Sequence, residues 1–331
     1  MLRSDLEVAV TCGYLLCRIA DTVEDEAELE SDARDTLYRA LLATLEKDAS
    51  PEAFTEVFKR RFTSSSTSEA EYSLASNLDV VIRVLKGLRP ELSVIVLRWV
   101  AEMARGMNIY SRRAPGSDGW WALKTLTDLE RYCYFVAGTV GHMLTELFTE
   151  ELSGLTPDAL RTLELHAEEF GLGLQLTNIL KDITDDRDRC VSFIPRTVVA
   201  AEALTLGDLI EPTQRSAAHR ALTPIFQRAE RALHAAFQYC LAIPGTHRDV
   251  RLFCLLPLFM AVATLRHARN NDAQFDSGQP VKISRQQVSS IISQCVRLCE
   301  DDAGLARLFG ELSPTPHVAT APSSALTDRA L

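Results

Sequence analysis

The sequence contains few of the residues that break helices or build tight turns. Among 331 residues there are only 15 glycines and 13 prolines, which disfavours a turn-rich all-β fold. The eight cysteines form no CxxC pair, and most lie in apolar helical stretches where a free cysteine acts as a small core residue. We therefore expect neither a disulfide framework nor a zinc site, and the composition favours a reduced, cytosolic protein.

Positive charge and long apolar runs are also scarce. The formal net charge of −10 argues against a nucleic-acid-binding protein, and an anionic substrate would need local positive charge from a metal or from well-placed Arg and Lys. No signal peptide is recognised, because Arg3, Asp5 and Glu7 interrupt the start of the chain. The longest apolar run, Cys254 to Leu265, is too short to cross a bilayer. Peripheral contact with a membrane stays open as a way to collect an apolar substrate.

The pattern that dominates the chain is helical. Apolar residues recur at three- and four-residue spacing, and no clean alternating run of strand length occurs, so we expect one all-α domain over residues 1–312. Residues 63–68 and 112–120 are predicted loops, the second with the composition of a mobile flap, and 313–331 is expected to be disordered. Helices are predicted over residues 5–26, 32–45 with Ser31 as N-cap, 69–88, 91–110, 127–151, 157–186, 214–241, 249–269 and 284–301.

Two short acidic clusters have helical spacing. In Asp21–Asp25 and in Asp182–Asp186, the first and last aspartates are four residues apart and fall on nearly the same helix face. Like charges stacked in this way repel each other. Mg²⁺ relieves such repulsion, since it takes one or two protein carboxylates and fills its other positions with water and phosphate oxygens. We predict that the two clusters form facing walls of one pocket for a diphosphate.

Further polar residues share a face with each cluster. Arg18 and Tyr14 lie on the arc of the first cluster, and an Arg binds phosphate well through its planar fork. An intrahelical salt bridge that only neutralises the aspartates is the alternative for Arg18. The second cluster continues a polar stripe that is flanked by apolar residues, so a buried stripe is favoured over a solvated outer face. Its members are Gln175, Asn178, Asp182, Asp186 and Arg189, with Lys181 to one side but able to reach a phosphate.

The segment between the clusters combines aromatic and small residues. In Tyr132–Gly141, Tyr132 and Val136 share one face, while Ala137 and Gly141 lie on the opposite one. Small residues permit the close approach of either a neighbouring helix or a long prenyl chain, and the sequence leaves both open.

Together these blocks resemble the squalene and phytoene synthases, which are head-to-head isoprenyl diphosphate synthases. The resemblance covers roughly residues 10–300, and two DxxxD motifs at family spacing with the other blocks are far more specific than one. The matching segments are YLLCRIADTVEDE (14–26), YCYFVAGTVG (132–141), GLGLQLTNILKDITDDRDR (171–189), the aromatic-x-Pro of Phe193–Pro195, FCLLPLFMAVATL (253–265) and VKIS (281–284).

The resemblance implies an all-α isoprenoid-synthase fold with a central apolar cavity. It also implies Mg²⁺-dependent condensation of two prenyl diphosphates, most often farnesyl diphosphate, with Tyr132 assisting proton handling or cation stabilisation. By the same resemblance Mg²⁺ is held by Asp21, Asp25, Asp182 and Asp186. The implied substrate contacts are Tyr14, Arg18, Val136, Ala137, Gly141, Gln175, Asn178, Lys181 and Arg189.

The product depends on how the reaction ends. The condensation forms a cyclopropylcarbinyl diphosphate, which gives squalene if NADPH supplies a hydride and dehydrosqualene or phytoene if a proton is lost. The DTVED motif and the 14–18 block look more like squalene synthase, and the block at 281–283 resembles one that contacts NADPH, which implies Lys282 and Arg285. An ordinary surface lysine is the alternative for Lys282. No GxGxxG motif is present, which excludes a Rossmann site.

Two departures from the family pattern keep other functions open. A Ser-Arg-(Thr/Ser)-Phe helix usually precedes the first acidic motif and is not found before Asp21, and Lys181 stands where many relatives have Arg. A catalytically weak relative that serves as a binding or assembly factor is therefore an alternative, although the four aspartates with Gln175 and Asn178 argue against it. A cyclising terpene synthase is a third alternative, which the 132–141 block disfavours.

Overall fold

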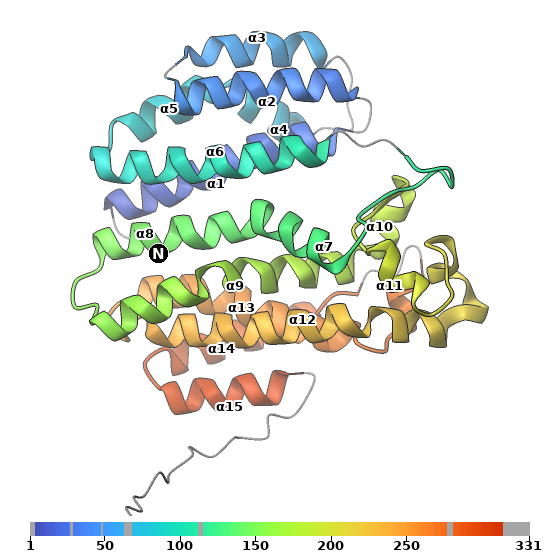
Figure 1. The fold of residues 1–331 in the computed structure, drawn as a ribbon. Coiled ribbons are helices and arrows are strands. Elements are labelled where there is room, and N and C mark those ends of the chain that lie inside the picture. The colour runs from blue at the N-terminus through green and yellow to red at the C-terminus, as the bar shows by residue number, and fades with distance from the viewer. Residues whose placement is uncertain are drawn as a thin grey trace, which may run out of the picture.

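The computed structural model describes residues 4–26, 29–47, 49–62, 68–111, 115–276 and 281–313. Residues 63–67 of the predicted loop, residues 112–114 of the predicted flap and the tail from 314 onward lie outside the described residues. The all-α fold is confirmed (Figure 1). Its helices are α1 (Ser4–Asp25), α2 (Ser31–Glu46), α3 (Pro51–Arg61), α4 (Glu69–Ser76), α5 (Leu78–Lys86), α6 (Pro90–Ser111), α7 (Leu126–Cys133), α8 (Thr139–Glu151), α9 (Pro157–Lys181), α10 (Ile183–Asp188), α11 (Arg196–Ala200), α12 (Arg215–Ala242), α13 (Arg248–Ala268), α14 (Arg285–Leu298) and α15 (Asp302–Leu312).

Short elements complete the fold. A π-helical turn, η1 (Tyr134–Gly138), joins α7 to α8, and three 3₁₀ turns follow later in the chain: η2 (Gly207–Ile210), η3 (Pro212–Gln214) and η4 (Asp272–Phe275). Strands β1 (Trp121–Ala122) and β2 (Val191–Ser192) form one parallel pair, in which Trp121 lies opposite Val191. This pair attaches the segment before α7 to the segment that follows α10.

The helices stack in layers from α3 at one end to α15 at the other (Figure 1). Helices α1, α2 and α6 pack together on one side, and α9, α12 and α13 pack together on the other. The α9–α12 contact is close, because a Cβ added to Gly173 would lie only 3.0 Å from the backbone nitrogen of Leu233. Small residues on α12, such as Ala229 and Ala232, are completely buried and permit this approach.

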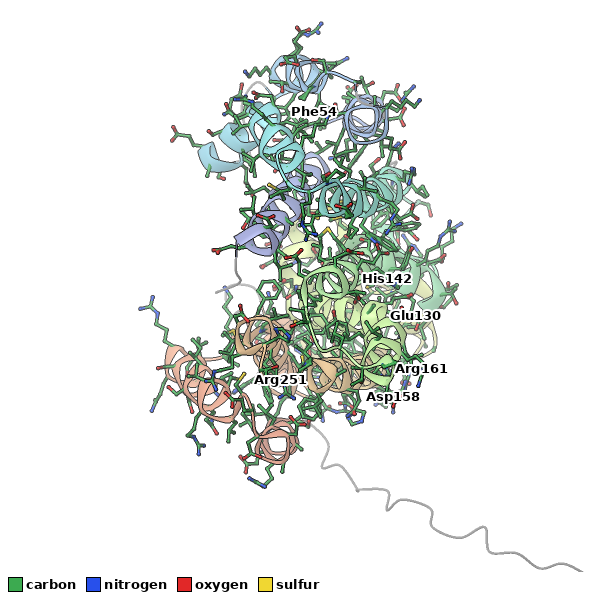
Figure 2. The ribbon with its side chains drawn as sticks, turned by 90° about the vertical axis from the view of Figure 1, so that its left-hand side faces the viewer. Phe54, Glu130, His142, Asp158, Arg161 and Arg251 are labelled. Carbon is green, nitrogen blue, oxygen red and sulfur yellow. The ribbon has the colours of Figure 1, made fainter. Side chains whose placement is uncertain are left out.

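Within the described residues, α13 alone has the length and apolar composition of a membrane span. It packs against α9, α12, α14 and α15, and Leu255, Leu258 and Phe259 are fully buried there. The buried guanidinium of Arg251 on the same helix donates to the carbonyl oxygens of Cys240 (3.2 Å) and Cys299 (3.0 Å) (Figure 2). Its apolar character is therefore accounted for by its place in the core.

Several predicted boundaries differ from the structure. The helix predicted over 69–88 is two helices, because Asn77 (φ −118°, ψ 32°) ends α4 and its side chain donates to the Ser73 carbonyl. Ser31 is not an N-cap but the first residue of α2, whose cap position is held by Glu30 without a side-chain hydrogen bond. Helices α3, α11 and α15 were not predicted. All eight cysteines are unpaired, as expected, and Cys190 is the exposed one.

Candidate active site

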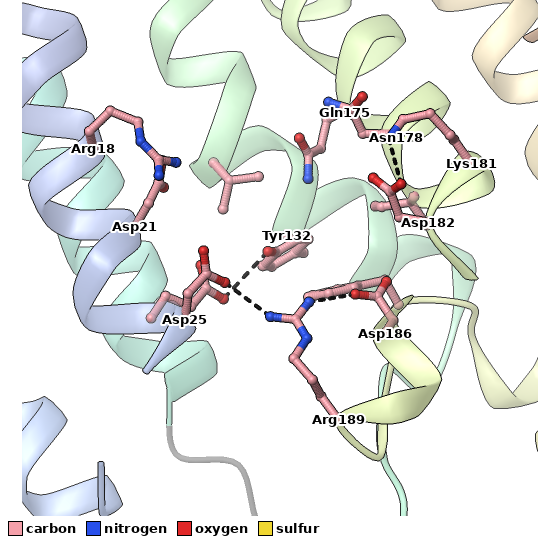
Figure 3. A pocket seen from close by; sticks show the side chains of 14 residues that line it. Arg18, Asp21, Asp25, Tyr132, Gln175, Asn178, Lys181, Asp182, Asp186 and Arg189 are labelled. Carbon is pink, nitrogen blue, oxygen red and sulfur yellow. Dashed lines mark hydrogen bonds and ion pairs between the residues drawn. The ribbon is translucent and has the colours of Figure 1, made fainter. Parts of the chain in front are cut away.

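The two acidic motifs face each other across a pocket of about 530 Å³ (Figure 3). One wall comes from α1, and the other comes from the end of α9 together with α10. The floor is formed by Tyr132 of α7, Val136 of η1 and Phe193. The prediction of facing walls is thus confirmed. The lining residues are Arg18, Asp21, Glu24, Asp25, Tyr132, Val136, Gln175, Asn178, Ile179, Lys181, Asp182, Asp186, Arg189 and Phe193.

The α1 wall is an unbroken helix that carries three carboxylates. Arg18 Nη1 lies 3.1 Å from Asp21 Oδ2, so the intrahelical ion pair considered from the sequence is present. Burial raises the pKa of Asp21 to about 7, and the nearby carboxylates of Glu24 and Asp25 add to the rise, while Arg18 opposes it. The wall therefore carries more negative charge than its own arginine compensates.

The second wall is not the single helix that was predicted over 157–186. Helix α9 ends at Lys181, and Asp182 takes φ −105° and ψ 20° before α10 begins. The buried side chain of Gln274 donates to the Leu180 carbonyl oxygen (2.9 Å), which satisfies one of the acceptors left at the helix end. The backbone N–H of Asp186 still bonds to the Asp182 carbonyl (3.0 Å), so the two aspartates stay one turn apart.

Basic side chains compensate all four aspartates. Arg189 joins the two walls, with Nη1 3.2 Å from Asp25 Oδ1 and Nη2 2.6 Å from Asp186 Oδ1 (Figure 3). Lys181 pairs with Asp182, and Arg18 pairs with Asp21. Each cation is thereby held at the pocket by a carboxylate, within reach of an anionic group that enters it.

The floor is built around the π-helical turn. Tyr132 is buried, its hydroxyl donates to Glu24 Oε1 (3.4 Å), and its ring stacks on Phe193 with centroids 4.6 Å apart. The turn that follows presents Val136 to the same pocket. A Cβ on Gly171 would lie 2.1 Å from the Ala137 carbonyl oxygen, so the turn rests directly on α9. Single π-turns often occur at functional sites because they alter which side chains face inward.

Some residues implied by the family resemblance lie away from the pocket lining. Tyr14 is 61% exposed. A Cβ on Gly141 would lie 1.8 Å from the Ala167 carbonyl oxygen, so this glycine permits the packing of α8 against α9, and the backbone carbonyl of Ala137 lies against Gly171 on α9. Lys282 and Arg285 are exposed at the start of α14, where Ser284 caps the helix.

Other lining residues were not assigned from the sequence. Glu24, Ile179 and Phe193 line the pocket, and Glu71 on α4 pairs with Arg18 from outside it. Glu24 sits inside the first acidic motif, so its position was a usable signal. Nothing local to Glu71 indicates its contact, because 53 residues separate it from Arg18.

The donor set fits Mg²⁺. Among the described residues no group of three or more His, Cys, Asp or Glu side chains is arranged to enclose a metal. Mg²⁺ does not require such a cage, since it is usually bound by one or two carboxylates together with phosphate oxygens and water. The carboxylates that both walls present to the pocket are suited to that mode of binding.

Comparison with known proteins identifies the family. The family model described as squalene/phytoene synthase matches residues 1–287. The chain belongs to this family. A squalene synthase of Schizosaccharomyces pombe is 30% identical over 297 residues, which cover 90% of this chain and 61% of the relative. A squalene synthase of Saccharomyces cerevisiae is 27% identical over 271 residues, which cover 82% of this chain and 57% of the relative.

Solved structures of family members share the fold. A TcSQS complex with the ligand BPH1237 superimposes with a TM-score of 0.76 at 24% identity, covering 94% of this chain and 83% of that one. A dehydrosqualene synthase in complex with a ligand gives a TM-score of 0.58 at 23% identity, covering 87% and 85%. The chain spans about three fifths of the length of the curated squalene synthases named above.

Proposed function

We propose that this squalene/phytoene synthase family member is a Mg²⁺-dependent prenyltransferase of the squalene synthase type. It would condense two farnesyl diphosphates head to head into a cyclopropylcarbinyl diphosphate, presqualene diphosphate, and convert this to squalene with NADPH. The observation that carries the proposal is the pocket in which two carboxylate walls and three basic side chains face each other above Tyr132.

The walls would bind the diphosphates. Arg18, Lys181 and Arg189 already lie at the pocket through their ion pairs, so they can exchange carboxylate oxygens for phosphate oxygens without a large movement. The carboxylates released in this exchange would hold Mg²⁺, with two from each motif: Asp21 and Asp25, Asp182 and Asp186. Bound there, Mg²⁺ neutralises the charge that develops on a departing diphosphate. Gln175 and Asn178 would donate to oxygens between the walls.

The floor would protect the allylic cation. Val136, Ile179 and Phe193 supply apolar surface beside the ion-binding walls, which keeps water from the reacting carbons. Tyr132 is held by Glu24 at one end and by Phe193 along its ring, so its hydroxyl has a fixed position from which to stabilise positive charge or to handle the proton. Ala137 and Gly141 would shape the channel through the position of the π-turn.

The proposal and its main alternative differ in the last step of the reaction, which is either reduction or loss of a proton. Reduction to squalene would use NADPH bound near Lys282 and Arg285, whereas loss of a proton would give dehydrosqualene or phytoene. The position of Lys282 and Arg285 outside the pocket lining favours the second outcome, and the names of the relatives favour the first. We further propose a cytosolic protein that contacts membranes peripherally, since the substrate carries a long apolar chain and the product is wholly apolar.

The test is product identification. Purified protein is incubated with farnesyl diphosphate and Mg²⁺, with and without NADPH, while diphosphate release is followed and products are identified by mass spectrometry. We expect Mg²⁺-dependent release in both cases and squalene only when NADPH is present. Dehydrosqualene under both conditions would support the non-reductive alternative. Substrate binding without diphosphate release would support a binding or assembly factor and contradict the proposal.

A further inference from the structure

Arg18 is held by two carboxylates that belong to different helices. Its Nη1 lies 3.1 Å from Asp21 Oδ2 on α1, and its Nη2 pairs with Glu71 Oε1 on α4. Helix α4 packs against α1, which places the first turn of α4 next to the outer end of the α1 wall. Glu71 belongs to neither acidic motif and does not line the pocket.

Glu71 is itself held in place. Its Oε2 accepts hydrogen bonds from the backbone N–H (3.2 Å) and the hydroxyl (2.9 Å) of Ser68, while its own backbone N–H donates to the Ser68 hydroxyl (3.3 Å). These contacts form a capping box at the start of α4. One carboxylate oxygen thus serves the helix, and the other is left to bind Arg18. Hydrogen bonds from Ser68 and the charge of Arg18 lower the pKa of Glu71, which keeps it ionised at neutral pH.

We propose that Glu71 is the positioning residue for Arg18 when Arg18 binds a diphosphate. This inference rests on the proposed function, in which Asp21 holds Mg²⁺ and can no longer pair fully with Arg18. Glu71 lies outside the set of metal-binding carboxylates and keeps its hold on Nη2. Because the guanidinium is planar, fixing Nη2 leaves Nη1 aimed at the pocket for a phosphate oxygen.

Three possible roles of Glu71 predict different changes in anion affinity when its charge is removed, so the positioning role can be distinguished from two simpler ones. If Glu71 acted only through its charge, its removal would strengthen binding of an anion, because one negative charge near the site is lost. If it served only as a helix cap, Glu71→Gln would change little, because Gln also completes a capping box. Positioning alone predicts weaker binding, because a loose Arg18 must then be ordered when the ligand arrives.

The probe is inorganic pyrophosphate in the presence of Mg²⁺, titrated calorimetrically into the full chain. Ordering one long side chain costs about 0.5–1.5 kcal/mol, so we expect Glu71→Gln to weaken binding roughly 2- to 10-fold. Glu69→Gln is the matched control, since it removes the same charge from the same helical turn but makes no ion pair with Arg18. It should leave the affinity unchanged or slightly higher.

A double-mutant cycle shows whether Glu71 acts through Arg18. Arg18→Gln should weaken pyrophosphate binding by itself, and adding Glu71→Gln to it should have no further effect. Ser68→Ala keeps the charge of Glu71 but removes the hydroxyl that donates to its carboxylate, so it should reproduce part of the loss and keeps the test usable if Glu71→Gln unfolds. Rescue by Glu71→Asp is not expected, because the shorter side chain cannot hold the cap and Arg18 together.

The outcomes separate the two proposals. Unchanged or tighter pyrophosphate binding by Glu71→Gln, or an equal loss with and without Arg18, would overturn the role of Glu71 and leave the proposed function standing. Failure of the unmodified protein to bind pyrophosphate with Mg²⁺ would overturn the proposed function and the positioning role with it.

Discussion

The first acidic motif lies on one unbroken helix, whereas the second spans the end of α9 and the start of α10. Their side chains also differ in exposure: Asp25 is 60% exposed, while Asp186, which is at the equivalent place in the second motif, is only 10% exposed. The α1 wall has three carboxylates and one arginine, and the second wall brings its own Lys181 and Arg189. The first wall is thus mainly an acceptor of cations, and the second supplies most of the positive charge.

This difference indicates that the first wall mainly binds cations and the second mainly binds anions. The α1 wall places three carboxylates beside one arginine, and Arg189 from the other wall adds a cation to it through the ion pair with Asp25. A diphosphate that enters the pocket would compete for Arg189 and leave both of its aspartates for Mg²⁺. Mutations in the two walls should therefore differ in what they impair, even where both impair turnover.

The largest effects are expected at the aspartates. Asp21→Asn or Asp182→Asn should lower diphosphate release from farnesyl diphosphate by about 10²- to 10³-fold with the fold intact, since each removes a negative oxygen that would hold Mg²⁺ against the leaving group. Circular dichroism checks the fold. Asp79→Asn on α5, which breaks a surface pair with Arg83, is the control and should be nearly neutral. Near-normal turnover of either active-site variant would show that its assigned role is wrong.

The next largest effect is expected at Tyr132, on the floor between the walls. Tyr132→Phe removes the hydroxyl that Glu24 holds and should slow the first condensation by about 100-fold, with a smaller effect on substrate binding. Single-turnover kinetics and equilibrium binding of an unreactive diphosphate separate the two effects. Tyr110→Phe removes a hydroxyl but keeps the ring that meets Tyr132 edge to face, and it should have little effect. An unchanged single-turnover rate would remove Tyr132 from the mechanism.

A smaller effect is expected at Arg189, which connects the two walls. Arg189→Gln removes the ion pairs to Asp25 and Asp186 and should weaken pyrophosphate binding about 10-fold, the size expected for lost hydrogen bonds to a charged group. Arg187→Gln, whose side chain pairs with Asp188 and does not line the pocket, is the control in the same segment. Equal affinities of the two variants would mean that the second wall does not supply Arg189 to the ligand.

The smallest effect concerns the helix break. Gln274→Leu leaves the Leu180 carbonyl without its side-chain donor and should lower stability by about 1–2 kcal/mol, or roughly 1–3 °C in the unfolding midpoint, with a modest loss of pyrophosphate affinity. Gln294→Leu on the surface of α14 is the matched amide control. A normal midpoint together with normal affinity would show that the break before Asp182 does not depend on Gln274.

Much of the fold and of the site could be predicted because both are encoded locally. Apolar spacing predicted α1, α6, α12 and α13 to within a residue or two at most ends, and four-residue spacing placed each aspartate pair on one face. The breaks at Asn77 and Asp182 were missed because an apolar pattern continues through both without a Pro or Gly to mark the change. The π-turn was missed because the helical pattern continues on both sides of its Gly138. The role of Ala137 and Gly141 was left open, since small residues suit both helix contact and a ligand channel.

By itself the sequence determined the helical class, the two aspartate pairs and the family, because these depend on residues within a turn or two of one another. Only the tertiary structure decided which charges meet, since Arg18 and Glu71 are 53 residues apart, Leu180 and Gln274 are 94 apart, and Asp25 and Arg189 are 164 apart. Packing of α4 against α1 and of η4 against α10 brings two of these pairs together, and Arg189 bridges the pocket to Asp25; no local pattern specifies such distances.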